Sequence, residues 1–194
     1  VSAVTQELLN EMAQSGCIKV SFGVESGSQR IINLNKKLIT IEQVKKAFDM
    51  AHKAKIKYVE GTFMIGSHPD EKPEDVKETI KLIKEIKPDL ISLSVVVPLP
   101  GTEIYELLKQ NNLIFAKEWD EFMFVAGTPK WRTFHFTPEE LVKWQRKGLM
   151  AFYFTPNYIF KRLSEVRSFG ELKYWTDIGM NFIKAIVFQQ KANA

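Results

Sequence analysis

Three short apolar segments, each followed by a loop that contains glycine or proline, set the main constraint on the fold of this chain. The segments occupy residues 18–23, 58–65 and 90–97, and the loops that follow them occupy residues 23–28, 66–71 and 98–102. Amphipathic helical patterns of crossover length lie between them. Strands joined by such crossovers must run parallel, and the crossovers are right-handed. The sequence therefore predicts an α/β fold, with the order α-β-α-β-α-β-α through about residue 111.

Start signals mark several of the expected helices. Thr40 and Gln43 form a capping box, Pro73 stands at the first helical position before two acidic residues, and Thr102 caps the helix after the third segment. Residues 90–97 are rich in β-branched side chains, and apolar residues occur at both odd and even positions. This pattern predicts a strand that is covered on both faces of the sheet.

The chain is expected to change character after residue 111. Residues 112–136 are irregular and aromatic-rich, and we expect them to wrap over apolar surface of the α/β part. Residues 137–140 form a complete helix start, Pro156 should interrupt that helix, and a last amphipathic helix begins at about Glu171. We therefore divide the chain into an α/β domain, residues 1–111, and a helical C-terminal extension, residues 112–194.

Composition limits the compartment and the partners. The single cysteine, Cys17, excludes an internal disulfide framework and fits a reducing compartment, so we expect a cytoplasmic protein. No uncharged apolar run approaches the ~20 residues of a membrane span, and none reads as a signal peptide. The whole net charge of +4 lies in residues 111–194, which hints at an anionic partner. A solvated helix face explains that charge more simply, and nucleic-acid binding is not expected.

The three loops together predict a ligand site. They follow the carboxyl ends of parallel strands, which converge at one rim. Glu25 could bind ribose hydroxyls or an amino group, or it could cap the turn after Gly23, and Ser26 is ambiguous in the same way. His68 lies beside two acidic residues, but no second His or Cys stands at ligand spacing, so no metal site is expected. The residues alone leave the reaction open.

Read together, these motifs resemble the radical S-adenosylmethionine (SAM) superfamily over about residues 5–110. The segments that resemble its fourth, fifth and sixth strands are residues 22–30, residues 63–66 with Pro69 and Glu71, and residues 98–102. Residues 136–156 resemble, more weakly, the C-terminal region of the cobalamin-dependent branch, which includes the anaerobic magnesium-protoporphyrin ester cyclases. The resemblance implies a partial (β/α) TIM-like half barrel with SAM across its C-terminal rim.

The resemblance also implies cofactor-binding positions. The polar groups of SAM would meet a carboxylate, a hydroxyl and a basic residue, adenine would lie against the fifth-strand segment, and proline and glycine would shape the last loop. Glu25, Ser26 and Lys37 would meet the polar groups of SAM. Met64, Ile65 and Gly66 belong to the fifth-strand segment, and Pro98 and Gly101 would shape the last loop. One departure affects the adenine contact: the loop 66–71 has one extra residue, and Asp70 replaces a glycine of the family pattern.

A second departure concerns the [4Fe–4S] cluster. The family holds this cluster on a CxxxCxxC motif, and the motif is absent here, because Cys17 is the only cysteine. We therefore expect a fragment that carries the C-terminal half of a radical SAM enzyme and is inactive alone. SAM and the cluster would be cofactors of the full-length enzyme, cobalamin would belong to another domain, and the small-molecule substrate is unknown.

Two further expectations follow from the sequence. The first strand of a half barrel would be an open edge, which predicts a homodimer formed through that edge. The alternative reading of the whole chain is a non-catalytic α/β module that binds a nucleotide or an anion and carries a basic C-terminal helical tail.

Overall fold

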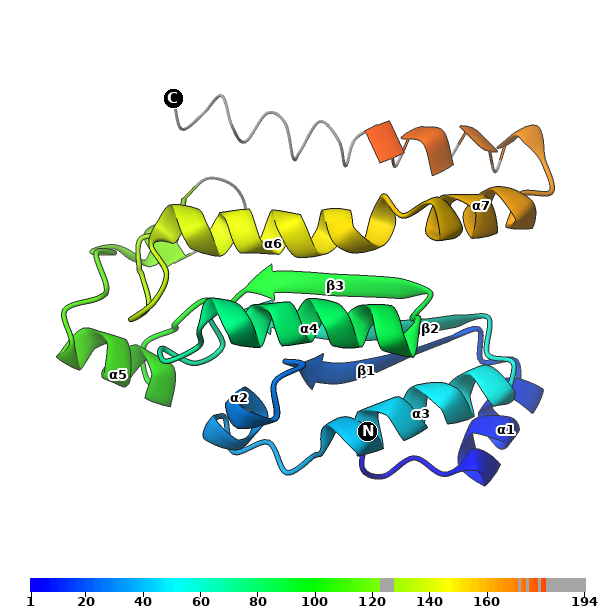
Figure 1. Ribbon diagram of the computed structural model, residues 1–194, viewed down its shortest axis with the longest axis horizontal. Coiled ribbons are helices and arrows are strands. Elements are labelled where there is room, and N and C mark those ends of the chain that lie inside the picture. Colours follow the sequence, from blue (N-terminus) through cyan, green and yellow to red (C-terminus); the bar gives the residue numbers. More distant parts are fainter. Residues whose placement is uncertain (123–127, 171, 174, 178, 181–194) are drawn as a thin grey trace.

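The computed structural model describes residues 1–122, 128–170, 172–173, 175–177 and 179–180, and these form three strands flanked by helices (Figure 1). The elements, in chain order, are α1 (Gln6–Gln14), β1 (Lys19–Glu25), α2 (Gln29–Leu34), α3 (Ile41–Lys53), β2 (Tyr58–Ile65), α4 (Pro73–Ile86), β3 (Leu90–Val95), α5 (Glu103–Gln110), the 3-10 helix η1 (Trp119–Phe122), α6 (Pro138–Tyr153) and α7 (Pro156–Glu165). The predicted order is confirmed, and the short helix α2 begins after Ser28, where the sequence also predicts a one-turn helix.

The three strands form one parallel sheet in the order β1-β2-β3. Lys19 of β1 pairs with Tyr58, and Glu60 of β2 pairs with Leu90. The arrows of β1 and β3 in Figure 1 point toward the end of the molecule where α2 and α5 lie, and β2 runs parallel to both. The loops after the strands therefore share one end of the sheet, as the sequence predicted.

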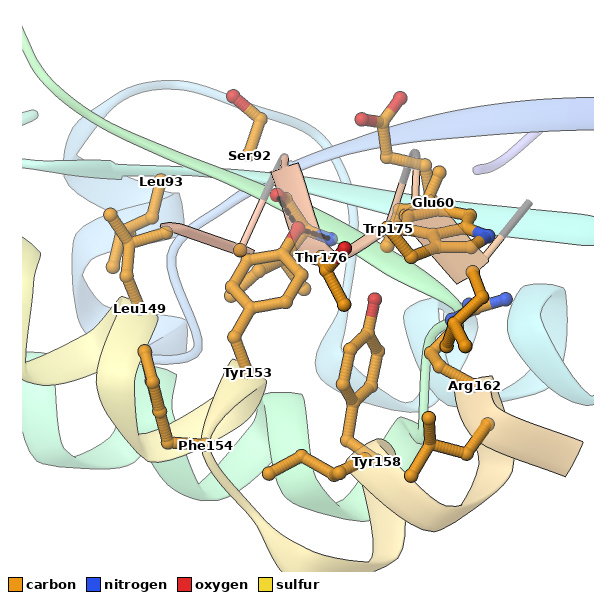
Figure 2. A pocket seen from close by; sticks show the side chains of 16 residues that line it. Glu60, Ser92, Leu93, Leu149, Tyr153, Phe154, Tyr158, Arg162, Trp175 and Thr176 are labelled. Carbon is orange, nitrogen blue, oxygen red and sulfur yellow. Dashed lines mark hydrogen bonds between the residues drawn. The ribbon is translucent and has the colours of Figure 1, made fainter. Parts of the chain in front are cut away.

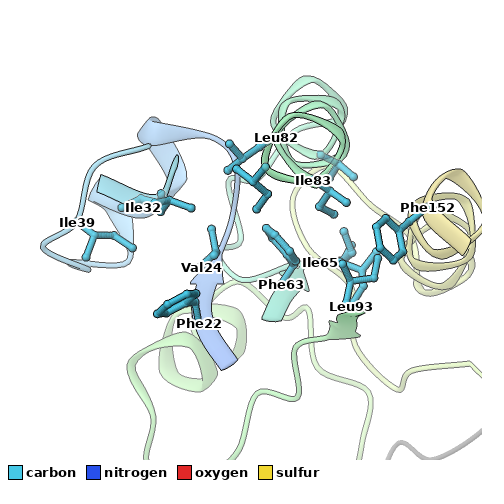
Figure 3. Close-up of a cluster of buried hydrophobic side chains, with 14 of the residues drawn as sticks. Phe22, Val24, Ile32, Ile39, Phe63, Ile65, Leu82, Ile83, Leu93 and Phe152 are labelled. Carbon is cyan, nitrogen blue, oxygen red and sulfur yellow. The ribbon is translucent and has the colours of Figure 1, made fainter. Parts of the chain in front are cut away.

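One face of the sheet carries the hydrophobic core. Phe22 and Val24 of β1, Phe63 of β2 and Leu93 of β3 are at most 4% exposed and point toward α3, α4 and α6 (Figure 3). The Phe22 ring meets the α3 residue Phe48 edge-on, with the ring centroids 5.1 Å apart. Burial of these aromatic and branched side chains is the main force that joins the helices to the sheet.

The opposite face of the sheet is polar and open, which corrects the expectation for the third strand. Ile91, Leu93 and Val95 of β3 face the helices, whereas Ser92 is only half-buried and Ser94 is exposed. The same alternation continues along β1 and β2, where the open face carries Lys19, Ser21, Glu60 and Thr62. The strand is therefore covered on one face only, because its serines occupy the positions that point away from the core.

The outer edge of β3 is closed by side chains of α6. The Ile91 N–H donates to Tyr153 Oη (3.1 Å), and that hydroxyl donates to the Ile91 carbonyl (2.7 Å). Gln145 Nε2 donates to the Leu93 carbonyl (2.9 Å). These side chains take the place of a neighbouring strand and protect the edge from pairing with another chain.

The outer edge of β1 is different. The Ile18 carbonyl accepts from Tyr58 N–H (2.9 Å), so alternate residues pair with β2 while Lys19, Ser21 and Gly23 turn their backbone groups outward. On this side the Cys17 thiol lies 3.3 Å from the Lys19 carbonyl. The sheet is thus closed at β3 and open at β1.

Helices α6 and α7 follow the sequence prediction closely. Thr137 caps α6 in a capping box with Glu140, and Pro156 starts α7 directly after α6 ends. The aromatic segment before α6 covers apolar surface in part: Phe122, Trp131 and Phe136 are buried, whereas other aromatic residues, Phe115, Trp119 and Phe134, are exposed. The helix expected from Glu171 falls largely outside the described residues. Within the described part of the chain, no helix combines the length and the apolar character that a membrane crossing requires.

Charged groups hold α7 against the beginning of β3. Arg162 is 6% exposed; its guanidinium donates to the Asp89 carbonyl and to Glu165 Oε2 (2.6 Å). Lys161 Nζ lies 2.5 Å from Asp89 Oδ1. Burial opposes the ionisation of Asp89, but hydrogen bonds from His52, Lys161 and the Val59 N–H hold its pKa well below the ordinary range.

Candidate functional site

The end of β1 carries an ion pair between two of the predicted cofactor-binding residues. Lys37 Nζ lies 2.6 Å from Glu25 Oε1, and the two side chains are 29% and 24% exposed. Glu25 adopts the left-handed conformation (φ 70°), which is rare for a residue other than glycine, and the strand pairing shifts register beside it. A Cβ atom at Gly23 would lie 2.9 Å from Glu25 Oε1 and 3.3 Å from Lys37 Nζ, so glycine at this position leaves room for the pair.

The next residues anchor the loop to α4. Ser26 is fully buried, and its Oγ lies 3.3 Å from Thr79 Oγ1, while the Gly27 N–H donates to the same Thr79 hydroxyl (2.8 Å). A Cβ atom at Gly27 would lie 2.5 Å from Thr79 Cα, which only glycine avoids. Ser26 therefore contacts the helix behind the loop, and its side chain makes the contacts of a structural hydroxyl.

The loop after β2 is held by a buried carboxyl group. The Gly66 N–H donates to Glu71 Oε2, Gly66 has φ 72°, and Glu71 is fully buried. Burial raises the pKa of Glu71 to about 8, against hydrogen bonds from the backbone of Gly66 and Ser67. Glu71 Oε1 has no hydrogen-bond partner among the described residues. This carboxyl group is therefore protonated at neutral pH and acts within the loop as a buried neutral acceptor.

Asp70, the residue that departs from the family pattern, takes part in an ion-pair network. Arg30 Nη1 lies 2.6 Å from Asp70 Oδ2, and Arg30 Nη2 pairs with Asp75 at the start of α4. His135 Nε2 lies 2.9 Å from Asp70 Oδ1, and these hydrogen bonds from His135 and Arg30 lower the pKa of Asp70. The network joins α2, the second loop, the start of α4 and the segment before α6, so Asp70 has a defined role in place of the expected glycine.

Two further contacts bring the loops together. Asn35 Nδ2 donates to Ser67 Oγ (3.1 Å), and Lys36 Nζ pairs with Glu103 (2.7 Å) at the start of α5. These contacts connect the segment after α2 to the loop after β2 and to the helix that follows the third loop. The shared rim predicted from the sequence is therefore present in the structure.

The remaining predicted residues divide between the rim and the core. Met64 is half-buried on the open face, whereas Ile65 is 1% exposed in the core beneath the sheet. Pro98 is buried, and Gly101 (φ 89°) has open space where a side chain would be. Met64 thus lies on the side of the sheet that carries Glu25 and Lys37, and Ile65 does not.

The described residues contain no cluster that fits a metal ion. No group of three or more His, Cys, Asp or Glu side chains in this part of the chain could hold one. His68 Nδ1 accepts from the Asp70 N–H (3.1 Å), and burial lowers the pKa of His68, so this imidazole is a neutral part of the loop.

An open parallel α/β sheet with a charged, glycine-bearing rim defines a class of ligand-binding domains. Residues 1–83 match the family model of the Radical SAM superfamily, and this match places the chain in that superfamily. An uncharacterized methyltransferase of Pyrococcus horikoshii is 33% identical over 169 residues, which cover 87% of this chain and 36% of that protein.

Two further comparisons agree with this placement. Anaerobic magnesium-protoporphyrin IX monomethyl ester cyclase of Cereibacter sphaeroides is 26% identical over 148 residues, which cover 76% of this chain and 23% of that protein. The structure of coproporphyrinogen III oxidase of Escherichia coli, a radical SAM enzyme, superimposes with a TM-score of 0.55 over 78% of this chain and 30% of that one. At 16% identity, this likeness shows the fold. The chain spans about a third or less of the length of these proteins.

Sequence reasoning missed two features of the molecule. Arg30 lies in residues 22–30, the segment that resembles the fourth strand of the superfamily. Its two carboxylate partners lie 40 and 45 positions away, and no local pattern indicates them. The second feature is a cavity beside β3, lined by residues of α6 and α7. The alternation of Ser92 and Ser94 with apolar residues was a visible signal that this face of β3 is open.

Proposed function

We propose that this chain supplies the SAM-binding rim of a radical SAM enzyme. In this proposal, the Lys37 ammonium group binds the SAM carboxylate, Glu25 binds the SAM amino group or ribose hydroxyls, and Met64 lies against adenine. The Glu25–Lys37 pair carries the proposal, because its two opposite charges match a zwitterionic ligand at the carboxyl ends of parallel strands. Without ligand, the two side chains neutralise each other.

The iron–sulfur cluster does not fit the residues of this chain. Three thiolates are needed to hold a [4Fe–4S] cluster with one iron open to SAM, and the sequence has one cysteine. We propose that the thiolates come from polypeptide outside this sequence, and that the chain alone does not cleave SAM. The role of Glu25, Lys37 and Met64 is to bind and orient SAM, and no residue of the chain is assigned to cobalamin.

Calorimetric titration with SAM tests the binding proposal. SAM should bind more tightly than ATP, and Lys37→Met or Glu25→Gln should weaken SAM binding by about tenfold or more. Lys53→Met is the matched control, because Lys53 lies on the exposed face of α3 and pairs, among the residues that the structure describes, with Asp49 of its own helix alone (2.6 Å). Equal affinity for ATP and SAM would instead support the non-catalytic nucleotide-binding module.

The absence of SAM cleavage needs a separate test. The chain is treated with iron and sulfide under reducing, oxygen-free conditions and then incubated with SAM. We expect no absorption band of a [4Fe–4S] cluster and no 5′-deoxyadenosine. Formation of either one would contradict the proposal that the cluster ligands lie elsewhere.

We also propose that the chain associates through the outer edge of β1. The outward-facing backbone groups of Lys19, Ser21 and Gly23 support this proposal, as does the closure of the other edge by Tyr153 and Gln145. Light scattering at high protein concentration should show a dimer. A strictly monomeric chain under these conditions would count against this association.

A further inference from the structure

A cavity of about 740 Å³ lies beside β3, and it is bounded by that strand, by α6 and α7, and by Leu172, Trp175, Thr176 and Gly179 (Figure 2). Residues 90–93, in the amino-terminal part of β3, form its floor. None of the described residues of the three rim loops lines it. The cavity is therefore separate from the proposed SAM site.

Apolar and aromatic side chains form most of the cavity wall. Leu149 and Tyr153 come from α6, Tyr158 and Leu163 from α7, and Trp175 from the segment that follows (Figure 2). The rings of Tyr153 and Tyr158 meet at 88° with their centroids 5.2 Å apart. Such a wall, in a volume of several hundred cubic ångströms, is typical of small-molecule sites.

The hydroxyl groups of the two tyrosines are already engaged. Tyr153 is hydrogen-bonded to the backbone of Ile91, and Tyr158 is hydrogen-bonded to Arg162. The Arg162 guanidinium lies over the rings of Tyr158 (5.1 Å) and Trp175 (5.9 Å), so the cavity presents the remaining surface of these two rings, and the ring of Tyr153, to a ligand. Aromatic faces of this kind bind flat apolar molecules through stacking and edge contacts.

Two charged side chains reach the cavity, and they differ in accessibility. The Arg162 side chain is 7% exposed and is bound to Asp89 and Glu165. The Glu60 side chain is 17% exposed. Its Oε2 lies 3.0 Å from Lys19 Nζ and accepts a hydrogen bond from the Ser21 hydroxyl. Its Oε1 has no partner among the described residues.

The electrostatic character of the cavity follows from Glu60. Burial favours the neutral form of this carboxyl group, but hydrogen bonds from Ser21 and Lys19 keep its pKa below the ordinary value, so it is ionised at neutral pH. A buried anion near the carboxylate would be repelled, and a hydrogen-bond donor would find an acceptor in Oε1.

We propose that this cavity binds a largely aromatic small molecule that carries a hydrogen-bond donor and no negative charge. The body of the ligand lies among Tyr153, Tyr158 and Trp175, and its donor meets Glu60 Oε1. The inference rests on the cavity alone and stands whether or not the rim binds SAM.

Two fluorescent probes with the same ring system test the proposal. N-phenyl-1-naphthylamine is uncharged with one N–H donor, and 8-anilino-1-naphthalenesulfonate adds a negative charge. The uncharged probe should bind one site per chain at least tenfold more tightly than the anionic probe, about 1.4 kcal/mol. Glu60→Gln should reduce this difference, whereas Glu78→Gln, on the exposed surface of α4, should leave it unchanged.

A pair of substitutions on one strand locates the probe. Ser92 lines the cavity, and Ser94 lies two residues further on the same face but outside it. Ser92→Phe should fill the cavity and weaken binding of the uncharged probe at least tenfold, and Ser94→Phe should change it less than twofold. Circular dichroism checks that both variants fold; if Ser92→Phe does not, Thr176→Phe on the opposite wall should give the same loss.

Several results would overturn the proposal. The uncharged probe could fail to bind, could bind equally to both serine variants, or could bind no more tightly than the anionic probe. The first two results would mean that the cavity is not a site, and the third would mean that Glu60 does not select its ligand. A SAM titration of Ser92→Phe separates the two proposals, because rim binding should persist in this variant.

Discussion

Replacing Glu71 by glutamine should make the folded chain more stable, and the gain should grow with pH. The Glu71 carboxyl group is fully buried, accepts from the Gly66 N–H through one oxygen, and has no partner among the described residues for the other. Asp75 lies near enough to raise its pKa further. Glutamine has the shape of the protonated carboxyl group and cannot ionise, so it should keep the Gly66 contact at any pH.

The magnitude follows from the difference between the folded and unfolded pKa values of Glu71. The pKa is 4.5 when the group is exposed and about 8 in the folded chain, because burial favours the neutral form. The folded state therefore keeps a proton that the unfolded state loses between these values, and the free energy of unfolding falls as pH rises through this window. At ~1.36 kcal/mol per pH unit, the full difference is roughly 5 kcal/mol.

Urea unfolding of the original chain and of Glu71→Gln, at pH values from 4 to 9, measures this difference. The two proteins should have similar stability at pH 4, Glu71→Gln should be about 2 kcal/mol more stable at pH 6, and the gain should level off above pH 8. Glu78→Gln, an exposed position on α4, is the control and should show no such trend. A constant difference across the range, or a loss that grows with pH, would refute the account of Glu71 as a neutral acceptor.

Three other predictions test particular contacts. Tyr153→Phe leaves the Ile91 N–H and carbonyl at the β3 edge unpaired and should lower the free energy of unfolding in urea by about 1–3 kcal/mol. The same change at the half-exposed Tyr105 is the control and should lower it by less than about 0.5 kcal/mol. Gly27→Ala places a Cβ atom 2.5 Å from Thr79 Cα and should cost about 1–3 kcal/mol; a midpoint of thermal unfolding equal to that of the original chain would contradict this contact. Asp89 has a lowered pKa in the folded chain, so its stabilising contribution is present above its ordinary value of 3.8 and is lost as pH falls; Asp89→Asn should flatten the acid limb of an unfolding profile followed by circular dichroism.

Local signals explain why much of the fold could be predicted. The capping boxes at Thr40 and Thr137 and the prolines at the starts of α4 and α7 act within a few residues, and the structure has helices that begin where these signals stand. The parallel order also follows from local information, because crossover length decides strand direction. The exposed face of β3 was misjudged because Val95, Val96 and Val97 concealed the serine alternation that precedes them.

The position of the candidate site could be predicted from the sequence, but several of its contacts could not. Convergence of the strand ends follows from topology, so the shared rim could be foreseen from the loop positions alone. The engagement of Ser26 with Thr79, 53 residues away, depends on how α4 packs behind the loop. The closure of the β3 edge by Tyr153, 62 residues from Ile91, has the same origin, since only tertiary packing brings such groups together.

A titration of the isotopically labelled chain with SAM, followed by amide chemical shifts in NMR spectra, tests the central claim most directly. The account predicts that the shifts change at the rim, at Glu25, Lys37, Met64 and Gly66, and that they stay unchanged around Trp175 in the cavity beside β3. Changes confined to that cavity, or no changes at SAM concentrations that saturate known radical SAM enzymes, would contradict the assignment of the rim as the SAM site.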